Sequence, residues 1–248
     1  MAAPHRTTYR LPANLNRKIG RAMHDYAMLA DGDRVMVAVS GGVDSNVLAW
    51  LLKFWQGKAP IRYTIRSVHI DNGFRSPDSP SPDPSEKIAE LMAELGIDHT
   101  TVAARSLEGE LSCYLCARNR RSQLFDLARE WQVNKIAFGH HVDDLIETLY
   151  LNMIYSGNIS TMVPKQTLFG GEVDIIRPLA YLEKEEIRGV ASTLAVDAVK
   201  NHCPLERDTR RQKVRDMLGE LYRREPKAKD SLFRAMGNVR LEYLLRSN

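Results

Sequence analysis

A glycine pair between an apolar run and a helical pattern is the feature that most constrains this chain. Residues 35–39 are apolar and mostly β-branched, which indicates a buried strand, and apolar residues recur at helical spacing over 47–55. Between them lies the segment Ser40–Ser45, with the sequence SGGVDS. Glycines let the backbone approach a ligand closely, and the N–H groups and dipole of a helix N-terminus favour anions. The segment therefore predicts a phosphate-binding loop.

Strands and helices alternate along the rest of the chain. Further apolar or β-branched runs predict strands over 63–70, 98–103, 135–139 and 173–177. Helical patterns lie between them and continue over 183–194, 206–222 and 228–245. Such alternation predicts an α/β fold with a doubly wound, mostly parallel sheet, here of five strands, and a small C-terminal helical extension. Ligands of these folds lie at the carboxyl ends of the strands.

The distribution of charge suggests three parts. Residues 1–30 contain a basic amphipathic helix, 31–200 the α/β domain, and 201–248 a helical extension with a third cysteine. The formal net charge is +4, and the last part alone carries 12 Lys and Arg against 7 Asp and Glu. The basic surplus therefore belongs to the C-terminal tail.

Composition also predicts a location. The chain has no apolar run long enough for a membrane helix, and residues 1–10 lack the apolar core of a signal peptide. Three cysteines are too few for a disulfide framework. We therefore expect a cytoplasmic protein without a membrane partner.

The loop differs from the commoner phosphate-binding loops. It lacks both the terminal lysine of the GxxxxGK(S/T) pattern and the GxGxxG spacing of dinucleotide-binding folds. Its Asp44 would repel phosphate unless a divalent cation lies between them, which implies Mg²⁺. The segment SGGVDS after the first strand resembles the PP-loop ATP pyrophosphatase family. This resemblance implies the adenine nucleotide alpha-hydrolase type of fold, cleavage of ATP between the α and β phosphates, and transfer of AMP to a carbonyl oxygen.

The three cysteines suggest a second centre. Cys113 and Cys116 are spaced CxxC at the start of a predicted helix, where two thiolates can share one metal, and Cys203 is the remaining cysteine. A redox dithiol needs only the pair, and a structural zinc site would need His202 as its fourth ligand. A third interpretation is an iron–sulfur cluster held by three thiolates, with one iron left open.

Several further segments resemble the tRNA 2-thiocytidine synthetases, a branch of the PP-loop enzymes. The likeness spans about residues 15 to 245 and includes the segments 113–121 (CYLCARNRR), 139–144 (GHHVDD), 149–153 (LYLNM), 176–179 (IRPL) and 203–218. It implies that Cys113, Cys116 and Cys203 hold a 4Fe-4S cluster whose free iron carries the sulfur to be transferred.

The resemblance also implies how ATP is held. The loop residues Ser40, Gly41, Gly42, Asp44 and Ser45 would bind its pyrophosphate end, together with Gly139. The backbone around Ile70 would recognise adenine, and Asp44 and Asp143 would hold Mg²⁺. Asp44, Arg120 and Asp143 would be the catalytic residues, with Arg120 stabilising charge on the α-phosphate.

The implied reaction is thiolation of a tRNA cytidine, at position 32 of the anticodon loop. Adenylation of the C2 oxygen would release pyrophosphate, and sulfur transfer from a donor protein or sulfide would then give 2-thiocytidine and AMP. Phosphate contacts are expected from basic residues of both termini. These are Arg17, Lys18, Arg21, Arg207, Arg210, Arg211, Lys213, Arg215, Arg223 and Arg224. The family precedent suggests a homodimer.

Two other functions are compatible with parts of the pattern. One is a zinc-bearing PP-loop enzyme, either a tRNA thiouridine synthetase or an amine ligase such as a lysidine synthetase, although the lysidine branch does not need the CxxC pair. The other is a non-catalytic ATP-binding module of the universal-stress type. That module would bind ATP without releasing pyrophosphate, and it leaves the three cysteines without a role.

Overall fold

The computed structural model describes residues 9–75, 83–106, 112–199, 203 and 209–245. The chain forms two compact units, each of which is described by itself. The first unit comprises residues 1–141 and 163–206, and the second comprises 142–162 and 207–248. The three-part division drawn from the sequence stays a prediction.

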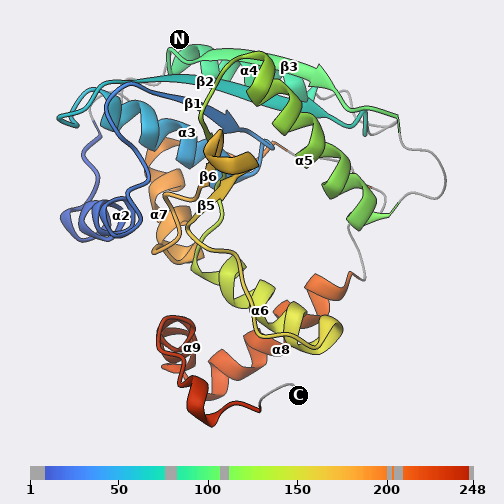
Figure 1. Cartoon of the computed structure of the whole chain (residues 1–248). Coiled ribbons are helices and arrows are strands. Elements are labelled where there is room, and N and C mark those ends of the chain that lie inside the picture. Colours follow the sequence, from blue (N-terminus) through green and yellow to red (C-terminus); the bar gives the residue numbers. More distant parts are fainter. Residues whose placement is uncertain (1–8, 76–82, 107–111, 200–202, 204–208, 246–248) are drawn as a thin grey trace. The chain divides into compact units, whose positions relative to one another are not determined.

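A single sheet organises the first unit (Figure 1). Its six described strands lie in the order β3-β2-β1-β4-β6-β5. Their bounds are β1 Asp33–Ala38, β2 Tyr63–Asp71, β3 Asp98–Ala103, β4 Lys135–Ala137, β5 Lys165–Leu168 and β6 Val173–Ile176. All neighbours pair in parallel except β5, which runs antiparallel to β6 at the edge.

The five predicted strands and the mostly parallel α/β fold are confirmed, but the number of strands was wrong by one. The missed strand β5 has the sequence KQTL and no buried residue. A polar edge strand of this kind lacks the apolar run that marks strands buried on both faces.

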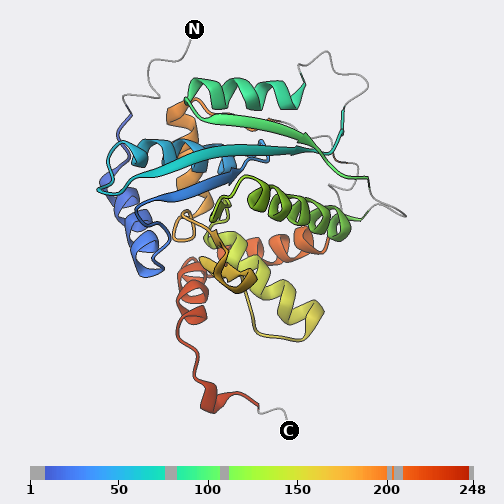
Figure 2. The same ribbon diagram turned by 45° about the horizontal axis from the view of Figure 1, so that its top comes forward.

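Helices cover both faces of the sheet (Figure 2). Alternate residues of β1 separate the two layers, because Val35 and Val37 belong to one apolar core and Met36 to the other. The first core also takes buried residues from the helices α2 (Ala13–Asp25), α3 (Val43–Gln56), α4 (Pro84–Glu94) and α7 (Lys184–Leu194). The second core takes Leu124 and Ala128 from α5 (Cys113–Glu130).

The second unit consists of helices around a small apolar core. The helices are α6 (Val142–Ser156), α8 (Arg210–Arg224) and α9 (Ala228–Met236), followed by the short η2 (Leu241–Tyr243). The predicted helix over 228–245 thus ends at Met236, where Gly237 follows. The predicted start of α8 at 206 lies outside the described residues.

A buried carboxylate binds α8 to α6 within this unit. The side chain of Glu147 is 6% exposed and accepts hydrogen bonds from Arg211 at 3.1 Å and from Arg215 at 2.8 Å.

No described helix of either unit combines the length and the apolarity that crossing a bilayer requires.

A buried ion pair joins the central strand β4 to the edge of the sheet. Lys135 Nζ lies 2.6 Å from Asp174 Oδ2 on β6, and Thr167 of β5 donates to the other carboxylate oxygen at 2.6 Å. Although burial acts to raise the pKa of Asp174, these hydrogen bonds hold it below its ordinary value. The pair therefore stabilises the fold above the ordinary pKa of aspartate, and this contribution is lost as the pH falls.

We expect Lys135→Met to lower the free energy of unfolding by about 2 kcal/mol at neutral pH, because it leaves the buried Asp174 with only the longer ion pair to Lys165, at 3.4 Å. The loss should shrink at acidic pH, where Asp174 takes up a proton. Urea titrations at both pH values measure it, with Lys53→Met on α3 as the control. Equal losses at the two pH values would contradict this account.

Candidate functional site

The glycine loop connects the carboxyl end of β1 to the first turn of α3. Two serine hydroxyls fix its shape, since Ser45 Oγ donates to the Gly42 carbonyl at 2.8 Å and accepts from the Ser40 amide at 3.2 Å. The hydroxyl of Ser40 in turn accepts from the Gly42 amide at 3.3 Å. The loop therefore has a defined conformation at a helix N-terminus, which is the arrangement that binds anions.

Two close approaches explain why glycines occupy this site. Gly41 has a φ of +84°, and a Cβ there would lie 3.0 Å from Ile88 of α4. Gly139 follows β4, and a Cβ on it would lie 2.9 Å from the backbone of Asp44. The structure thus brings Gly139 against the loop, as the sequence predicts for two segments that follow neighbouring parallel strands.

A buried asparagine supports the loop from behind. Asn46 has no exposed surface, and its side-chain amide donates to the carbonyls of Gly41 and Asp197, each at 3.2 Å. The Val199 amide donates to the same Gly41 carbonyl at 2.8 Å. The sequence analysis missed Asn46, whose signal was its polar side chain inside the apolar pattern of α3.

The carboxylate of Asp44 lies in the first turn of α3 and is 33% exposed. His141 Nε2 lies 3.7 Å from its Oδ2, and the His141 side chain is 3% exposed. Asp44 therefore remains accessible to solvent beside a buried imidazole. Such a carboxylate oxygen suits Mg²⁺, which binds one or two carboxylates and keeps several waters.

A second loop follows β2 at the neighbouring strand end. Asp71 accepts two hydrogen bonds from the Arg75 guanidinium, at 2.6 and 3.0 Å, and these bonds hold the pKa of its carboxyl well below the usual range. Ser40, His69, Asp71 and Arg75 are among the residues that line a small cavity between this loop and the glycine loop.

Ile70 stands differently from its neighbours in β2. Its side chain is 6% exposed and packs in the core beneath α5, whereas the flanking His69 and Asp71 line the cavity. Successive side chains of a strand point to opposite faces of the sheet. On the face that borders the cavity, His69 and Asp71 therefore present their side chains, and Ile70 presents only its backbone. Adenine recognition by that backbone stays a prediction.

The CxxC pair occupies the first turn of α5. Ser112 caps this helix through a hydrogen bond from the Leu115 amide at 3.2 Å. Cys113 is exposed, and the half-buried Cys116 lies with its Sγ 3.5 Å from Oδ1 of Asn72, in the loop after β2. The thiol pair therefore lies at the same sheet edge as the glycine loop, at the N-terminus of a helix.

Cys203 is half-buried and belongs to the first unit. Its neighbours 200–202 and 204–208, and with them the proposed zinc ligand His202 and the basic Arg207, lie outside the described residues. Among those described, no three His, Cys, Asp or Glu side chains are grouped closely enough to hold a metal ion. The convergence of Cys203 with the CxxC pair thus stays a prediction.

A buried arginine lies at the carboxyl end of β6. Arg177 is 5% exposed, and its Nε donates to His140 Nδ1 at 3.2 Å. Because a guanidinium only donates, the proton of neutral His140 is placed on Nε2. Burial lowers the pKa of Arg177 to about 10, and the charge of Arg121 adds to this. The segment IRPL was noted in the sequence, but this role of Arg177 was not.

The remaining predicted catalytic residues lie on α5 and in the second unit. Arg120 is half-buried on α5, one turn after Cys116 and on the same side of the helix. Asp143 lies in the first turn of α6 in the second unit, where Lys229 Nζ lies 2.9 Å from its Oδ1. Roles for Arg120 and Asp143 stay predictions.

Several of the basic residues expected to contact nucleic acid already have acidic partners. Glu147 binds Arg211 and Arg215, and Glu220 binds Arg223 and Arg224. In the first unit, Lys18 pairs with Glu186 at 2.8 Å and Arg21 with Asp25 at 3.4 Å. These ion pairs reduce the charge that the predicted basic patch can offer to phosphates.

Comparison with known proteins decides the family. The model of the PP-loop domain matches residues 11–221. The chain belongs to the PP-loop family. The glycine loop lies within the matched residues, and its role in binding ATP stays a prediction.

Relatives narrow the comparison within the PP-loop family. The tRNA-cytidine(32) 2-sulfurtransferase of Geobacter sulfurreducens is 37% identical over 241 residues, covering 93% of this chain and 91% of that protein. The protein of the same name from Geobacter metallireducens is 35% identical, covering 92% and 90%. The chain and these relatives belong to one family.

A solved structure shares the fold of this chain. It is the U34-tRNA thiolase NcsA from Methanococcus maripaludis, solved with its 4Fe-4S cluster. The TM-score is 0.74 at 22% identity, and the match covers 93% of this chain and 80% of that one. At this identity the likeness supports the fold of the chain and nothing finer.

The contact between Gly139 and Asp44 gives a test of the PP-loop geometry. Gly139→Ala should weaken ATP binding by about tenfold or more, a cost of about 1.4 kcal/mol, because the new methyl group displaces the Asp44 backbone. Calorimetric titration with a non-hydrolysable ATP analogue measures it.

Gly189→Ala is the matched control, since a Cβ there meets nothing within 4 Å on α7. It should leave ATP binding unchanged and raise stability by about 0.5–1 kcal/mol, as expected for Gly→Ala in a helix. Unchanged nucleotide affinity in Gly139→Ala would show that the loop does not depend on this contact.

Proposed function

We propose that this protein is an ATP-dependent tRNA-cytidine 2-sulfurtransferase that converts cytidine 32 of tRNA to 2-thiocytidine, with release of AMP and pyrophosphate. The relatives that share 35–37% of its residues over nearly their whole length carry that name. One structural observation supports it most. The thiol of Cys116 lies 3.5 Å from Asn72, beside the cavity that Ser40 and Asp71 line next to the PP-loop.

Adenylation converts the C2 oxygen of cytosine into a good leaving group. The C2 oxygen of cytosine is a poor leaving group, so it attacks the α-phosphorus of ATP and pyrophosphate departs. A sulfur nucleophile then adds at C2, and the oxygen leaves as part of AMP. A PP-loop for ATP and thiols at one sheet edge meet the two requirements of this sequence.

The loop residues Ser40, Gly41, Gly42, Asp44 and Ser45 would bind the pyrophosphate end of ATP, with Gly139 keeping the space beside Asp44 open. The accessible carboxylate of Asp44 would hold Mg²⁺ between itself and the phosphates. Arg120 would stabilise the charge that develops on the α-phosphate. Asp143 as a second Mg²⁺ ligand remains a prediction from the sequence.

The donors present fit an iron–sulfur cluster. Cys113 and Cys116 are one turn apart at the start of α5, where two sulfur ligands can share one metal centre, and the chain contains one further cysteine, Cys203. Three thiolates would hold a 4Fe-4S cluster and leave one iron open to carry the transferred sulfur. The NcsA structure, with its 4Fe-4S cluster, has the same fold.

The proposed reaction also requires an RNA substrate and a source of sulfur. The substrate is tRNA, the sulfur comes from a donor protein or sulfide, and the active form is a homodimer in the cytoplasm. The target base must lie in a single-stranded loop, because a base stacked in an A-form helix does not present its C2 oxygen to an enclosed pocket.

Asp44→Ala should abolish 2-thiocytidine formation, because it removes the proposed Mg²⁺ ligand from the PP-loop. Mass spectrometry of nucleosides from tRNA incubated with the purified protein, ATP and sulfide measures the product. Glu90→Gln on α4 removes an exposed carboxylate elsewhere and should retain full activity. Normal thiolation by Asp44→Ala would refute the mechanism.

Cys113→Ser tests the metal centre separately. Protein purified without oxygen should be brown and contain iron, and the variant should lose the colour and most of the iron while still binding ATP. Metal analysis and the visible absorption spectrum report this independently of activity. Stoichiometric zinc in place of iron would instead favour the zinc-bearing PP-loop enzymes.

A further inference from the structure

One side of α5 carries two aromatic and three basic residues that the ATP site does not use. Tyr114, Arg118, Arg121, Phe125 and Arg129 are spaced by three or four residues and therefore form one stripe along the helix. Tyr114 is 70% exposed, and the three arginines are exposed. The stripe is about 22 Å long at about 1.5 Å per residue.

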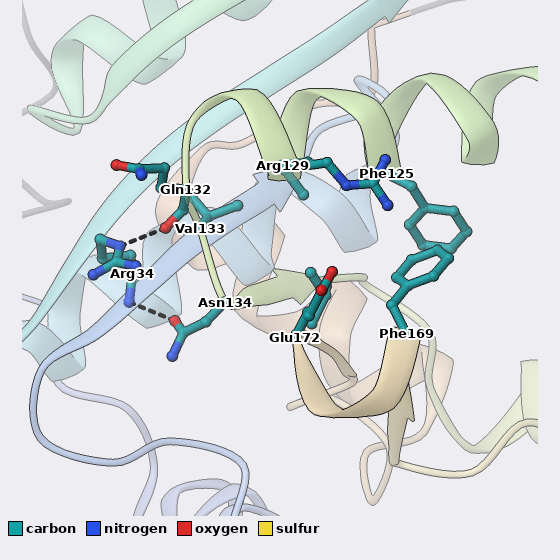
Figure 3. A pocket seen from close by; sticks show the side chains of 10 residues that line it. Arg34, Phe125, Arg129, Gln132, Val133, Asn134, Phe169 and Glu172 are labelled. Carbon is teal, nitrogen blue, oxygen red and sulfur yellow. Dashed lines mark hydrogen bonds between the residues drawn. The ribbon is translucent and has the colours of Figure 1, made fainter.

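The stripe is one wall of a groove. Arg118, Arg121, Phe125 and Arg129 of α5 line a hollow of about 380 Å³ together with Phe169, which lies in η1 (Phe169–Gly171) between β5 and β6. In Figure 3 the rings of Phe125 and Phe169 meet edge to face beside Arg129. The groove continues toward Arg34 at the amino end of the sheet.

The charge of the groove is positive. Arg118 and Arg121 form no ion pair with any residue that the structure describes, and Arg129 lies over the Phe169 ring at 5.6 Å. The acidic residue between them, Asp126, is paired with Arg105 at 2.6 Å. The groove therefore offers cations and aromatic faces together, unlike the tail, where acidic partners already hold several arginines.

Phe169 is held in a costly backbone conformation. Its φ is +52°, a left-handed value that is unusual for a bulky residue, and its side chain is 46% exposed. Two glycines with positive φ, Gly170 and Gly171, complete the turn. The ring packs edge to face on Phe125 and still leaves nearly half of the side chain exposed, so the strained turn presents an aromatic surface to the groove.

We propose that this groove binds the RNA strand of the tRNA substrate, with the arginines on its phosphates and Phe169 stacked on a base. Arginines interleaved with aromatic rings are the usual means of holding single-stranded RNA, since phosphates and base faces are common to all sequences. A stripe of about 22 Å would accommodate about six stacked nucleotides at about 3.4 Å each. The inference rests on the proposed function for the identity of the RNA.

The groove would hold nucleotides that flank the target. Cys113, Cys116 and Arg120 face another side of α5, about 150° around the helix from the stripe at about 100° per residue. Only the N-terminal end of the stripe, at Tyr114, lies beside the thiol pair. The bound strand would thus approach the reaction centre from the groove, with the reacting base turned around the start of α5.

The test compares two triple variants in the full-length protein. The groove variant lacks the three groove cations and is Arg118→Gln/Arg121→Gln/Arg129→Gln. The control variant lacks three exposed cations elsewhere in the first unit and is Lys58→Gln/Arg62→Gln/Arg188→Gln. The probe is a fluorescent anticodon stem–loop RNA with cytidine at position 32, titrated over a series of KCl concentrations.

The groove variant should bind this RNA about tenfold more weakly or worse at low salt. The slope of log affinity against log salt should fall by about 2, since each phosphate contact on a single strand contributes about 0.7. The control should keep the affinity within about twofold. Equal affinity and slope in groove variant and wild type, or equal losses in both triple variants, would overturn the proposal.

The substitution Phe169→Gly distinguishes an effect on RNA binding from an effect on stability. It removes the ring but relieves the left-handed strain, so the melting temperature should change little while RNA affinity falls about tenfold. An unchanged RNA affinity would remove Phe169 from the binding site.

Failure of the proposed function would show in a different measurement. If wild-type protein forms no 2-thiocytidine, the function is wrong, whatever the binding data. If it does form the product, and the groove variant does so with an unchanged KM for tRNA, the groove is not the RNA site. The groove variant could also bind RNA normally and lose thiolation only when a donor protein supplies the sulfur. That result would make the groove a protein interface and would also overturn the proposal.

Discussion

The contact between Gly139 and the backbone of Asp44 fixes the architecture of this site. β1 and β4 are neighbours in the sheet, so the loops that follow them leave the same edge together. Only a residue without a Cβ lets the two backbones approach this closely. The serine hydroxyl bonds, the buried Asn46 and the N-terminus of α3 then hold the loop in a shape that receives phosphates.

Most of the ionised groups described above have a partner within their own unit. Arg75 binds Asp71, Lys135 binds Asp174, and Glu147 binds two arginines of α8. Burying such groups without partners would cost several kcal/mol each. Asp44, with its accessible carboxylate, and the exposed arginines of the α5 stripe differ from these paired groups. We therefore assign Asp44 to the cation that accompanies ATP and the α5 arginines to RNA.

The sequence alone predicted much of the fold and the principal motifs. The five predicted strands and the PP-loop were recognisable because the strands are short apolar or β-branched runs and the glycine loop is a compact motif between two of these elements. β5 escaped notice since an exposed edge strand has no such run. Asn46 and Arg177 escaped because their roles depend on carbonyls and rings contributed by distant segments, which no local pattern reveals.

The amino-acid sequence by itself determined the chemistry available: a loop for phosphates, a carboxylate within it, and a thiol pair at a helix start. Tertiary structure decided which of these groups meet. Parallel pairing of β1 with β2 and β4 places the loop, Asn72 and Gly139 at one edge, and the Cys116 thiol reaches Asn72 there. It also decided which arginines are engaged and which remain exposed. Ion pairing depends on separations of a few ångströms, and these arise only when the chain is folded.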